Sequence, residues 1–248
     1  MKKIVLFLCF YIAFSAFAFA QAESTGMELS LRSEVFRGQP LVFTVFTPNN
    51  AEYFKVKWQG ITIEVPAEYV ASGASAEVMM PTIYDKANIY TLAVTAVSAN
   101  GEESKSLKVK VQDKEYPKES LTVEPKYVNP GKAAQDRIAK ETPLSRAALR
   151  TFSAKRQWVL PISKPSDAVS GVFGEQRVFN GVPKSKHSGM DFRAKTGDPI
   201  YAVADGKVVL TGDFYYNGQF VFVDHGQGMI TAYLHMSEII AKTGDDVA

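Results

Sequence analysis

The chain has 248 residues, a length that allows about two modest domains. Hydrophobic residues make up 46% of it and charged residues 22%, which is the ordinary composition of a soluble protein. The formal net charge is only +2, too small to indicate a nucleic-acid partner.

Residues 1–20 are predicted to be a cleaved secretory signal. Two lysines open the segment, residues 4–19 are apolar, and Ala18-Phe19-Ala20 gives the small-x-small pattern that precedes a cut before Gln21. An uncleaved membrane anchor is the alternative, but the apolar stretch is short for a span of about 20 residues. The single cysteine, Cys9, lies inside this stretch. We therefore expect a cysteine-free mature protein in the periplasm or cell envelope, with no stable membrane span.

Residues 21–113 are predicted to form an immunoglobulin-like β-sandwich. Apolar residues alternate with other residues in several short runs, which is the period of half-buried strands; they are Leu41, Phe43, Val45, Phe54, Val56, Trp58, Leu92, Val94, Ala96, Leu107, Val109 and Val111. Turn signals separate the runs, at Pro48-Asn49-Asn50, Gln59-Gly60, Ser72-Gly73 and Asn100-Gly101. Trp58 is expected in the core. The pattern leaves open whether this domain is a spacer, an inhibitory cover or a binding module.

Residues 114–157 are predicted to be a linker with short helices. Three residue–proline pairs favour extended backbone at its start, since a residue before proline avoids the helical region. A helix is expected over residues 132–141. Thr142-Pro143 then resembles a cap and first-turn proline, so a second helix is expected to run to Phe152. The charges suggest a solvated helix that lies on one of the domains.

Residues 158–248 return to a strand pattern. Hairpins are expected at Asp205-Gly206, at Asn217-Gly218 and at residues 225–228. Strand alternation places Phe222 and Asp224 on one face and Val221, Val223 and His225 on the other. It also places Tyr233 and His235 on one face and Ala232, Leu234 and Met236 on the opposite face; all of these positions are read from the sequence.

A histidine and an aspartate four residues apart, His187 and Asp191, are the first candidates for chemistry. Zinc accepts imidazole nitrogen and carboxylate oxygen at about 2.0–2.2 Å. A straight strand would hold the two residues roughly 13 Å apart, at about 3.3 Å per residue. We therefore expect the backbone to bend at Ser188-Gly189, between the two side chains. Such a pair is common by chance and becomes meaningful only with its surroundings.

Several motifs follow one another in a fixed order in this part of the chain. They are Phe173-Gly174-x-x-Arg177, His187-x-x-x-Asp191-Phe192, Ala202-x-x-Asp205-Gly206-x-Val208 and Tyr233-x-His235. With this order and spacing, the sequence from about residue 173 to the end resembles the lysostaphin-type, or LytM-domain, zinc endopeptidases that cut peptidoglycan peptides. The resemblance implies a mainly β fold, with an antiparallel β-sheet peptidase domain after the sandwich and linker.

The resemblance also implies roles for individual residues. His187 and Asp191 would be ligands of a Zn²⁺ cofactor, and His235 would be a catalytic histidine. The family's third ligand belongs to a His-x-His motif further downstream, and the printed sequence has no histidine after His235. We therefore expect the domain to be incomplete, and residues 21–248 expressed alone to bind zinc weakly, to cleave negligibly and to aggregate. A longer reading frame with a His-x-His motif would favour the enzyme.

Two further residues have open roles. Arg177 can contact a substrate carboxylate through its two-pronged guanidinium, or it can form a structural salt bridge. His225 lies in a glycine-rich turn and is expected to hydrogen-bond the backbone, so it is left out of the site.

The implied function is a secreted zinc endopeptidase whose substrate is peptidoglycan. The alternative is a non-catalytic LytM-domain regulator that activates a cell-wall amidase; retention of His187, Asp191 and His235 argues against it. A plain adhesive β protein is disfavoured by the ordered motifs.

Overall fold

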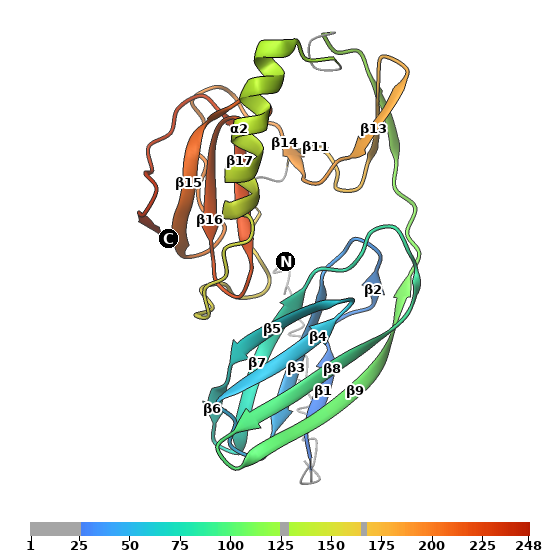
Figure 1. Cartoon of the computed structure of the whole chain (residues 1–248), viewed down its shortest axis with the longest axis vertical. Helices are drawn as coiled ribbons and strands as arrows, with labels where there is room; N and C mark the ends of the chain where they lie inside the picture. The colour runs from blue at the N-terminus through green and yellow to red at the C-terminus, as the bar shows by residue number, and fades with distance from the viewer. Residues whose placement is uncertain (1–25, 125–128, 165–167) are drawn as a thin grey trace, which may run out of the picture.

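The computed structural model describes residues 26–124, 129–164 and 168–248. The secretory signal predicted for residues 1–20 lies outside these ranges. Within them the protein is mainly β, as predicted, and α2 is the one helix. Figure 1 shows a sandwich built from strands β1 to β9 and, above it, a second body built from α2 and the later strands. No helix of the described ranges has the length and apolar character that crossing a membrane requires.

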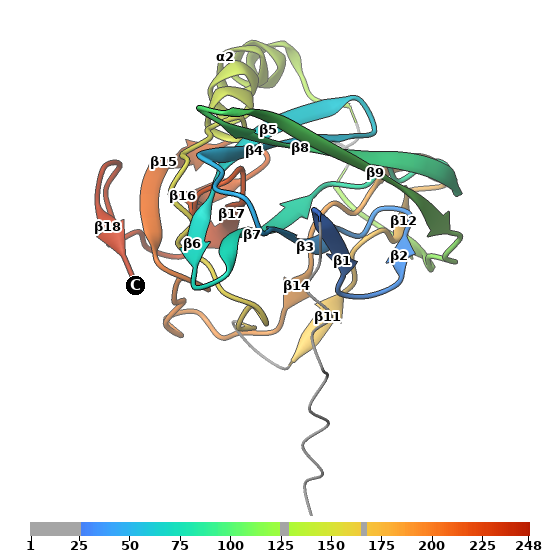
Figure 2. The ribbon, with the colours of Figure 1, turned by 90° about the horizontal axis from the view of Figure 1, so that it is seen from below.

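The N-terminal body is a two-layer sandwich (Figure 2). One sheet has the order β1-β3-β7-β6, from β1 (Glu28–Leu31), β3 (Leu41–Thr47), β7 (Gly73–Met80) and β6 (Glu68–Val70). The other has the order β2-β9-β8-β4-β5, from β2 (Val35–Phe36), β9 (Gly101–Gln112), β8 (Asn88–Ser98), β4 (Tyr53–Trp58) and β5 (Ile61–Pro66). The two layers confirm the predicted sandwich, whereas the immunoglobulin-like type stays a prediction.

Strand alternation explains the core between the two layers. In β3 and β4, and over residues 92–96 of β8, every second residue is buried, because the side chains of a strand point alternately to its two faces. The core residues predicted in these runs are buried, except that Leu107 is only partly buried. Trp58 is fully buried, as expected for a core residue. The predicted turns at residues 48–50, 59–60, 72–73 and 100–101 each separate two strands.

The linker contributes more to the second body than its composition suggested. β10 (Lys118–Leu121) pairs in parallel with β12 (Gln176–Phe179), which pairs with β13 (Val182–Lys186). The two predicted helices form one helix, α2 (Lys132–Ala148), with Pro143 inside it, so the predicted break at Thr142-Pro143 is wrong.

Tertiary contacts explain why α2 continues past its proline. A proline removes one backbone hydrogen bond from a helix. On the N-terminal side of the proline, Arg137 donates to the Asp213 carbonyl at 2.6 Å and Glu141 accepts from the Tyr215 amide at 2.7 Å. Beyond it, Ala148 packs with Phe220. The helix therefore lies on the C-terminal sheet, in agreement with the predicted solvated helix on one of the domains (Figure 1).

The C-terminal sheet has the order β17-β16-β15-β18, from β17 (Ile230–Met236), β16 (Gly218–Asp224), β15 (Gly206–Phe214) and β18 (Asp246–Val247). Phe220 and Phe222 pack in one cluster with Ala148, whereas Val221 and Val223 pack in another. The predicted alternation along β16 is thus confirmed, and this central strand is covered on both faces.

Two of the three predicted hairpins of this region are present. Asn217-Gly218 joins β15 to β16, and residues 225–228 join β16 to β17. The hairpin expected at Asp205-Gly206 is wrong. The strand before it is β14 (Asp191–Phe192), which pairs instead with β11 (Val169–Gly171), so Gly206 only begins β15.

Arg156 is one of the residues that join the two bodies. Its guanidinium donates to Glu77 and to Glu68 of the sandwich, each at 2.8 Å, and lies 5.3 Å from the ring centroid of Trp158. The segment that carries Arg156 is held in turn by the β16–β17 hairpin. There the Trp158 indole donates to the Gly226 carbonyl, and Gln227 donates to the Ser153 carbonyl at 2.6 Å.

We predict that Gly226→Ala destabilises the protein by about 2–4 kcal/mol, because it combines backbone strain with a steric clash. Gly226 has φ +88°, and an added Cβ would lie 1.8 Å from the Lys155 carbonyl oxygen. Gly197→Ala is the matched control, because Gly197 has φ +93° with nothing within 4 Å of an added Cβ. Denaturant unfolding measures both variants, and equal losses of stability would show that the close approach has no energetic importance.

Candidate functional site

The backbone of His187 is held by pairing with the segment that precedes β12. The Gly174 amide donates to the His187 carbonyl at 2.7 Å, and the His187 amide donates to the Glu175 carbonyl at 2.8 Å. His187 follows the last residue of β13, and Asp191 begins β14. The residues between them belong to neither strand, which confirms the predicted bend at Ser188-Gly189.

Hydrogen bonding orients the His187 ring. Its Nδ1 lies 3.0 Å from the Val172 carbonyl oxygen, which can only accept a hydrogen bond. A neutral ring that donates from Nδ1 has its free lone pair on Nε2, the nitrogen that lies 3.2 Å from Oδ1 of Asp191. The Arg177 guanidinium is 3.3 Å from Nδ1 but is itself a donor, so in this tautomer it contacts the ring without a hydrogen bond.

The spacing of Nε2 of His187 and Oδ1 of Asp191 fits a metal ion. Tetrahedral zinc with bonds of about 2.0–2.1 Å holds neighbouring ligand atoms about 3.3 Å apart. The observed separation of 3.2 Å between Nε2 of His187 and Oδ1 of Asp191 agrees with that spacing. The His187 side chain is 12% exposed and that of Asp191 is 48% exposed. One candidate ligand is therefore largely enclosed, and the other is open to solvent.

Arg177 holds the second oxygen of the aspartate. Its Nη2 donates to Oδ2 of Asp191 at 2.5 Å, and its Nε is 3.5 Å from a carboxylate oxygen of Glu119 and 3.8 Å from one of Glu175. These contacts correspond to the structural salt bridge that the sequence left open, and substrate binding by Arg177 stays a prediction. Oδ1 of Asp191 remains turned towards His187.

His235 does not join this cluster. It makes no hydrogen bond or ion pair with His187 or Asp191 in the part of the chain that the structure describes. Its amide donates to the Asn217 carbonyl at 2.9 Å, and its Nδ1 is 3.4 Å from where a Cβ on Gly218 would be. The structure thus brings together two of the three residues assigned to the site and places the third, His235, in β17 against the β15–β16 turn.

An irregularity in β17 corrects the regular alternation predicted for this strand. Tyr233 pairs with Val221 and Met236 with Gln219, so β17 has one residue more than β16 in this interval. His235 lies in the interval with φ +57°. As a result Tyr233 and Met236 pack against the same cluster, although simple alternation placed them on opposite faces. The prediction that Tyr233 and Met236 lie on opposite faces is wrong, because a bulge breaks the two-residue period.

His225 is fully buried, and both ring nitrogens have partners. Nδ1 lies 2.7 Å from the Asp205 carbonyl oxygen, and Nε2 lies 2.7 Å from the Thr231 hydroxyl. This bonding agrees with the backbone-bonding role expected from the sequence and with the exclusion of His225 from the site.

Sequence reasoning missed Gly171 and Glu119. An added Cβ on Gly171 would lie 2.6 Å from Oδ2 of Asp191, so glycine permits the approach of the carboxylate. Glu119 reaches Arg177 through the parallel pairing of β10 with β12. A strand in a proline-rich linker has no periodic signal, whereas Gly171 could have been noticed from its position next to the Phe173-Gly174 motif.

No group of three or more His, Cys, Asp or Glu side chains is gathered to hold a metal among residues 26–124, 129–164 and 168–248. Among these residues the His187–Asp191 pair is the candidate for metal binding.

Comparison with known proteins identifies relatives of this part of the chain. The sequence profile of Peptidase family M23 matches residues 185–248. The Peptidoglycan DD-endopeptidase ShyA of Vibrio cholerae is 42% identical over 62 residues, which are 25% of this chain and 14% of that protein. ShyC of the same organism, also named a Peptidoglycan DD-endopeptidase, is 36% identical over 80 residues, 32% of this chain and 18% of that protein. The matches thus span less than a fifth of these two relatives.

Two further similarities extend the comparison. The lipoprotein YgeR of Escherichia coli, which is named as uncharacterized, is 36% identical over 62 residues, a quarter of each protein. A crystal structure from Pseudomonas aeruginosa, described as a candidate peptidase M23, superposes with a TM-score of 0.61 at 27% identity. That similarity covers 87% of this chain and 79% of the other, so it includes the sandwich as well as the C-terminal body.

We predict that Gly171→Ala weakens zinc binding about 10–100-fold, the usual effect of disturbing groups that orient a ligand. The new Cβ would push Asp191 away from Arg177 and His187. Gly131→Ala is the control, since an added Cβ there meets nothing within 4 Å. Competition with a chromophoric chelator measures both affinities. Unchanged affinity in Gly171→Ala would contradict the importance of the carboxylate's position.

Proposed function

We propose that the protein is a metallopeptidase which hydrolyses peptide bonds in peptidoglycan, starting from the match of residues 185–248 to Peptidase family M23. The stem peptides or their cross-links are the proposed substrate class. The observation that carries the proposal is the 3.2 Å separation of Nε2 of His187 and Oδ1 of Asp191 in the domain that matches this family. The names of ShyA and ShyC support peptidoglycan as the substrate.

The proposed cofactor is Zn²⁺, held by His187 and Asp191 together with ligands beyond this pair. When bound, zinc polarises the scissile carbonyl and lowers the pKa of a bound water to about 7. His187 presents Nε2 because Nδ1 is directed to the Val172 carbonyl. Asp191 presents Oδ1 because Arg177 binds Oδ2.

His235 is proposed to accept or return a proton during the reaction, or to stabilise the developing oxyanion. Its side chain is exposed, as a group that meets a substrate must be. The φ of +57° at His235 is a conformation that a residue other than glycine adopts at some energetic cost, and such strain is concentrated at functional sites.

The proposed location is the cell envelope. The signal pattern of residues 1–20 and the names of the relatives, two peptidoglycan endopeptidases and a lipoprotein, support this location. The alternative of a non-catalytic amidase activator is disfavoured, because a binding surface has no need of a histidine and a carboxylate placed at ligand spacing.

We predict that His187→Ala and Asp191→Ala lose zinc, whereas His235→Ala keeps zinc and loses about 10²–10⁴-fold in rate. Ligands determine metal affinity, while an acid–base group acts mainly on the chemical step. Metal analysis of the full-length protein, alongside digestion of purified peptidoglycan with and without chelator, measures both effects. A His235→Ala variant that loses zinc as completely as His187→Ala would show that the assigned roles are wrong.

A further inference from the structure

A cleft of about 440 Å³ lies beside His187, and both bodies of the protein line it. Tyr84 and Asp85 come from the loop between β7 and β8 of the sandwich, whereas Phe173 and Lys186 come from the C-terminal body. Ligand pockets in proteins are typically about 300–1,000 Å³. The sandwich thus leaves a space of ligand size next to the candidate metal ligand, instead of filling it.

The sandwich loop is fixed to the backbone that carries His187. The Tyr84 hydroxyl donates to the Gly174 carbonyl at 2.7 Å, and the Gly174 amide donates to the His187 carbonyl at 2.7 Å. The Tyr84 ring also stacks on Tyr116, with centroids 4.7 Å apart, and meets Phe173 edge-on at 6.2 Å. Two hydrogen bonds and an aromatic cluster therefore determine where Tyr84 and Asp85 lie relative to His187.

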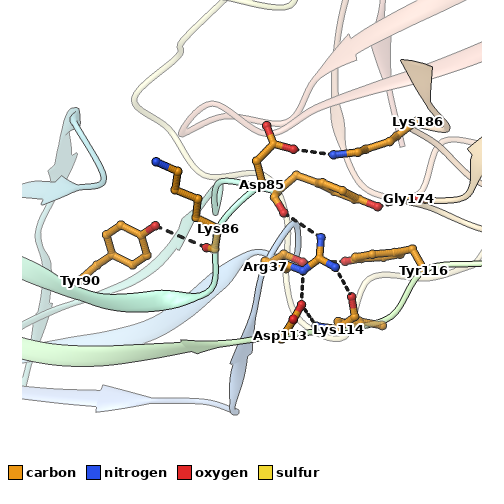
Figure 3. Close-up of polar contacts among 10 residues, drawn as sticks. Arg37, Asp85, Lys86, Tyr90, Asp113, Lys114, Tyr116, Gly174 and Lys186 are labelled. Atoms are coloured by element: carbon orange, nitrogen blue, oxygen red, sulfur yellow. Dashed lines mark hydrogen bonds and ion pairs between the residues drawn. The ribbon is translucent and has the colours of Figure 1, made fainter. Parts of the chain in front are cut away.

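Two opposite charges stand at the rim of the cleft. Lys186 donates to Asp85 at 2.5 Å, in the contact drawn in Figure 3, and its ammonium lies 3.8 Å from the ring centroid of Tyr84. The Asp85 side chain is 73% exposed and that of Lys186 is 37% exposed. Exposed ion pairs contribute about 0–1 kcal/mol, so a ligand with matching charges can replace each partner at little cost.

We propose that this cleft is a substrate subsite for a short peptide end that carries both a free ammonium and a free carboxylate. Asp85 binds the ammonium, Lys186 binds the carboxylate, and the Tyr84 and Phe173 rings cover the apolar part of the peptide. The inference rests on the proposed function, since it assigns the cleft to the peptide that the His187–Asp191 site would cleave. It gives the sandwich a part in substrate recognition.

The test uses three related peptides that differ by one charge each. Nα-acetyl-L-lysyl-D-alanine has one ammonium and one carboxylate; its Nε-acetylated form lacks the ammonium, and its C-terminal amide lacks the carboxylate. Titrations followed by NMR measure the affinity of the mature protein for each peptide. We expect loss of either charge to weaken binding by up to about fivefold, the upper end of the range for one exposed ion pair.

Variants of Asp85 and Lys186 show which charged group of the peptide each side chain binds. Asp85→Asn is expected to lose discrimination against the Nε-acetylated peptide only, and Lys186→Gln to lose discrimination against the amide only. Asp113→Asn is the matched control, because Asp113 is 76% exposed and pairs with Arg37 at the same junction, without lining the cleft (Figure 3). It should discriminate as the unmodified protein does.

Three results would overturn the inference: no binding of the three peptides, equal binding of all three, or tighter binding by Asp85→Asn and Lys186→Gln. The last would mean that the loop covers the site. Peptidoglycan digestion is measured separately on the same samples. Chelator-sensitive digestion without charge discrimination removes the subsite and leaves the proposed function intact, whereas discrimination without digestion removes the proposed enzyme and leaves a peptide-binding cleft.

Discussion

The geometry of the candidate site depends on the ion pair between Arg177 and Asp191. The guanidinium binds Oδ2, so the other carboxylate oxygen faces His187 at the spacing of two ligands on one ion. Glu119 and Glu175 lie near the same guanidinium and add negative charge around it. Because Gly171 has no side chain, the carboxylate can approach this closely. A guanidinium next to a candidate metal ligand would oppose the binding of a cation, and the two glutamates would offset part of this repulsion.

Contacts on two sides of this site join the sandwich to the C-terminal body. Arg156 joins them at one side through Glu68 and Glu77, and Tyr84 joins them at the other through the Gly174 carbonyl. Gly174 is needed there, because an added Cβ would lie 2.1 Å from the Tyr116 ring. The glycine of the Phe173-Gly174 motif therefore serves the junction between the bodies as well as the pairing with His187.

The parts predicted correctly from the sequence are those with a local cause. Alternation places Leu41, Phe43 and Val45 in the core because the strand period is two, and the bend between His187 and Asp191 follows from a glycine between them. Long-range contacts were not predictable in this way. The tertiary contacts that keep α2 continuous past Pro143, and the bulge that redirects His235, depend on partners far away in the sequence. The role of His235 is still carried by the family resemblance and not by a contact.

Anomalous scattering at the zinc edge, from crystals of the protein soaked in zinc, tests the central claim most directly. The account predicts a peak within about 2.0–2.2 Å of both Nε2 of His187 and a carboxylate oxygen of Asp191. It also predicts that Arg177 remains on the other oxygen of that carboxylate. A peak that lacks Asp191 among its ligands, or no peak at this pair at saturating zinc, would contradict the account.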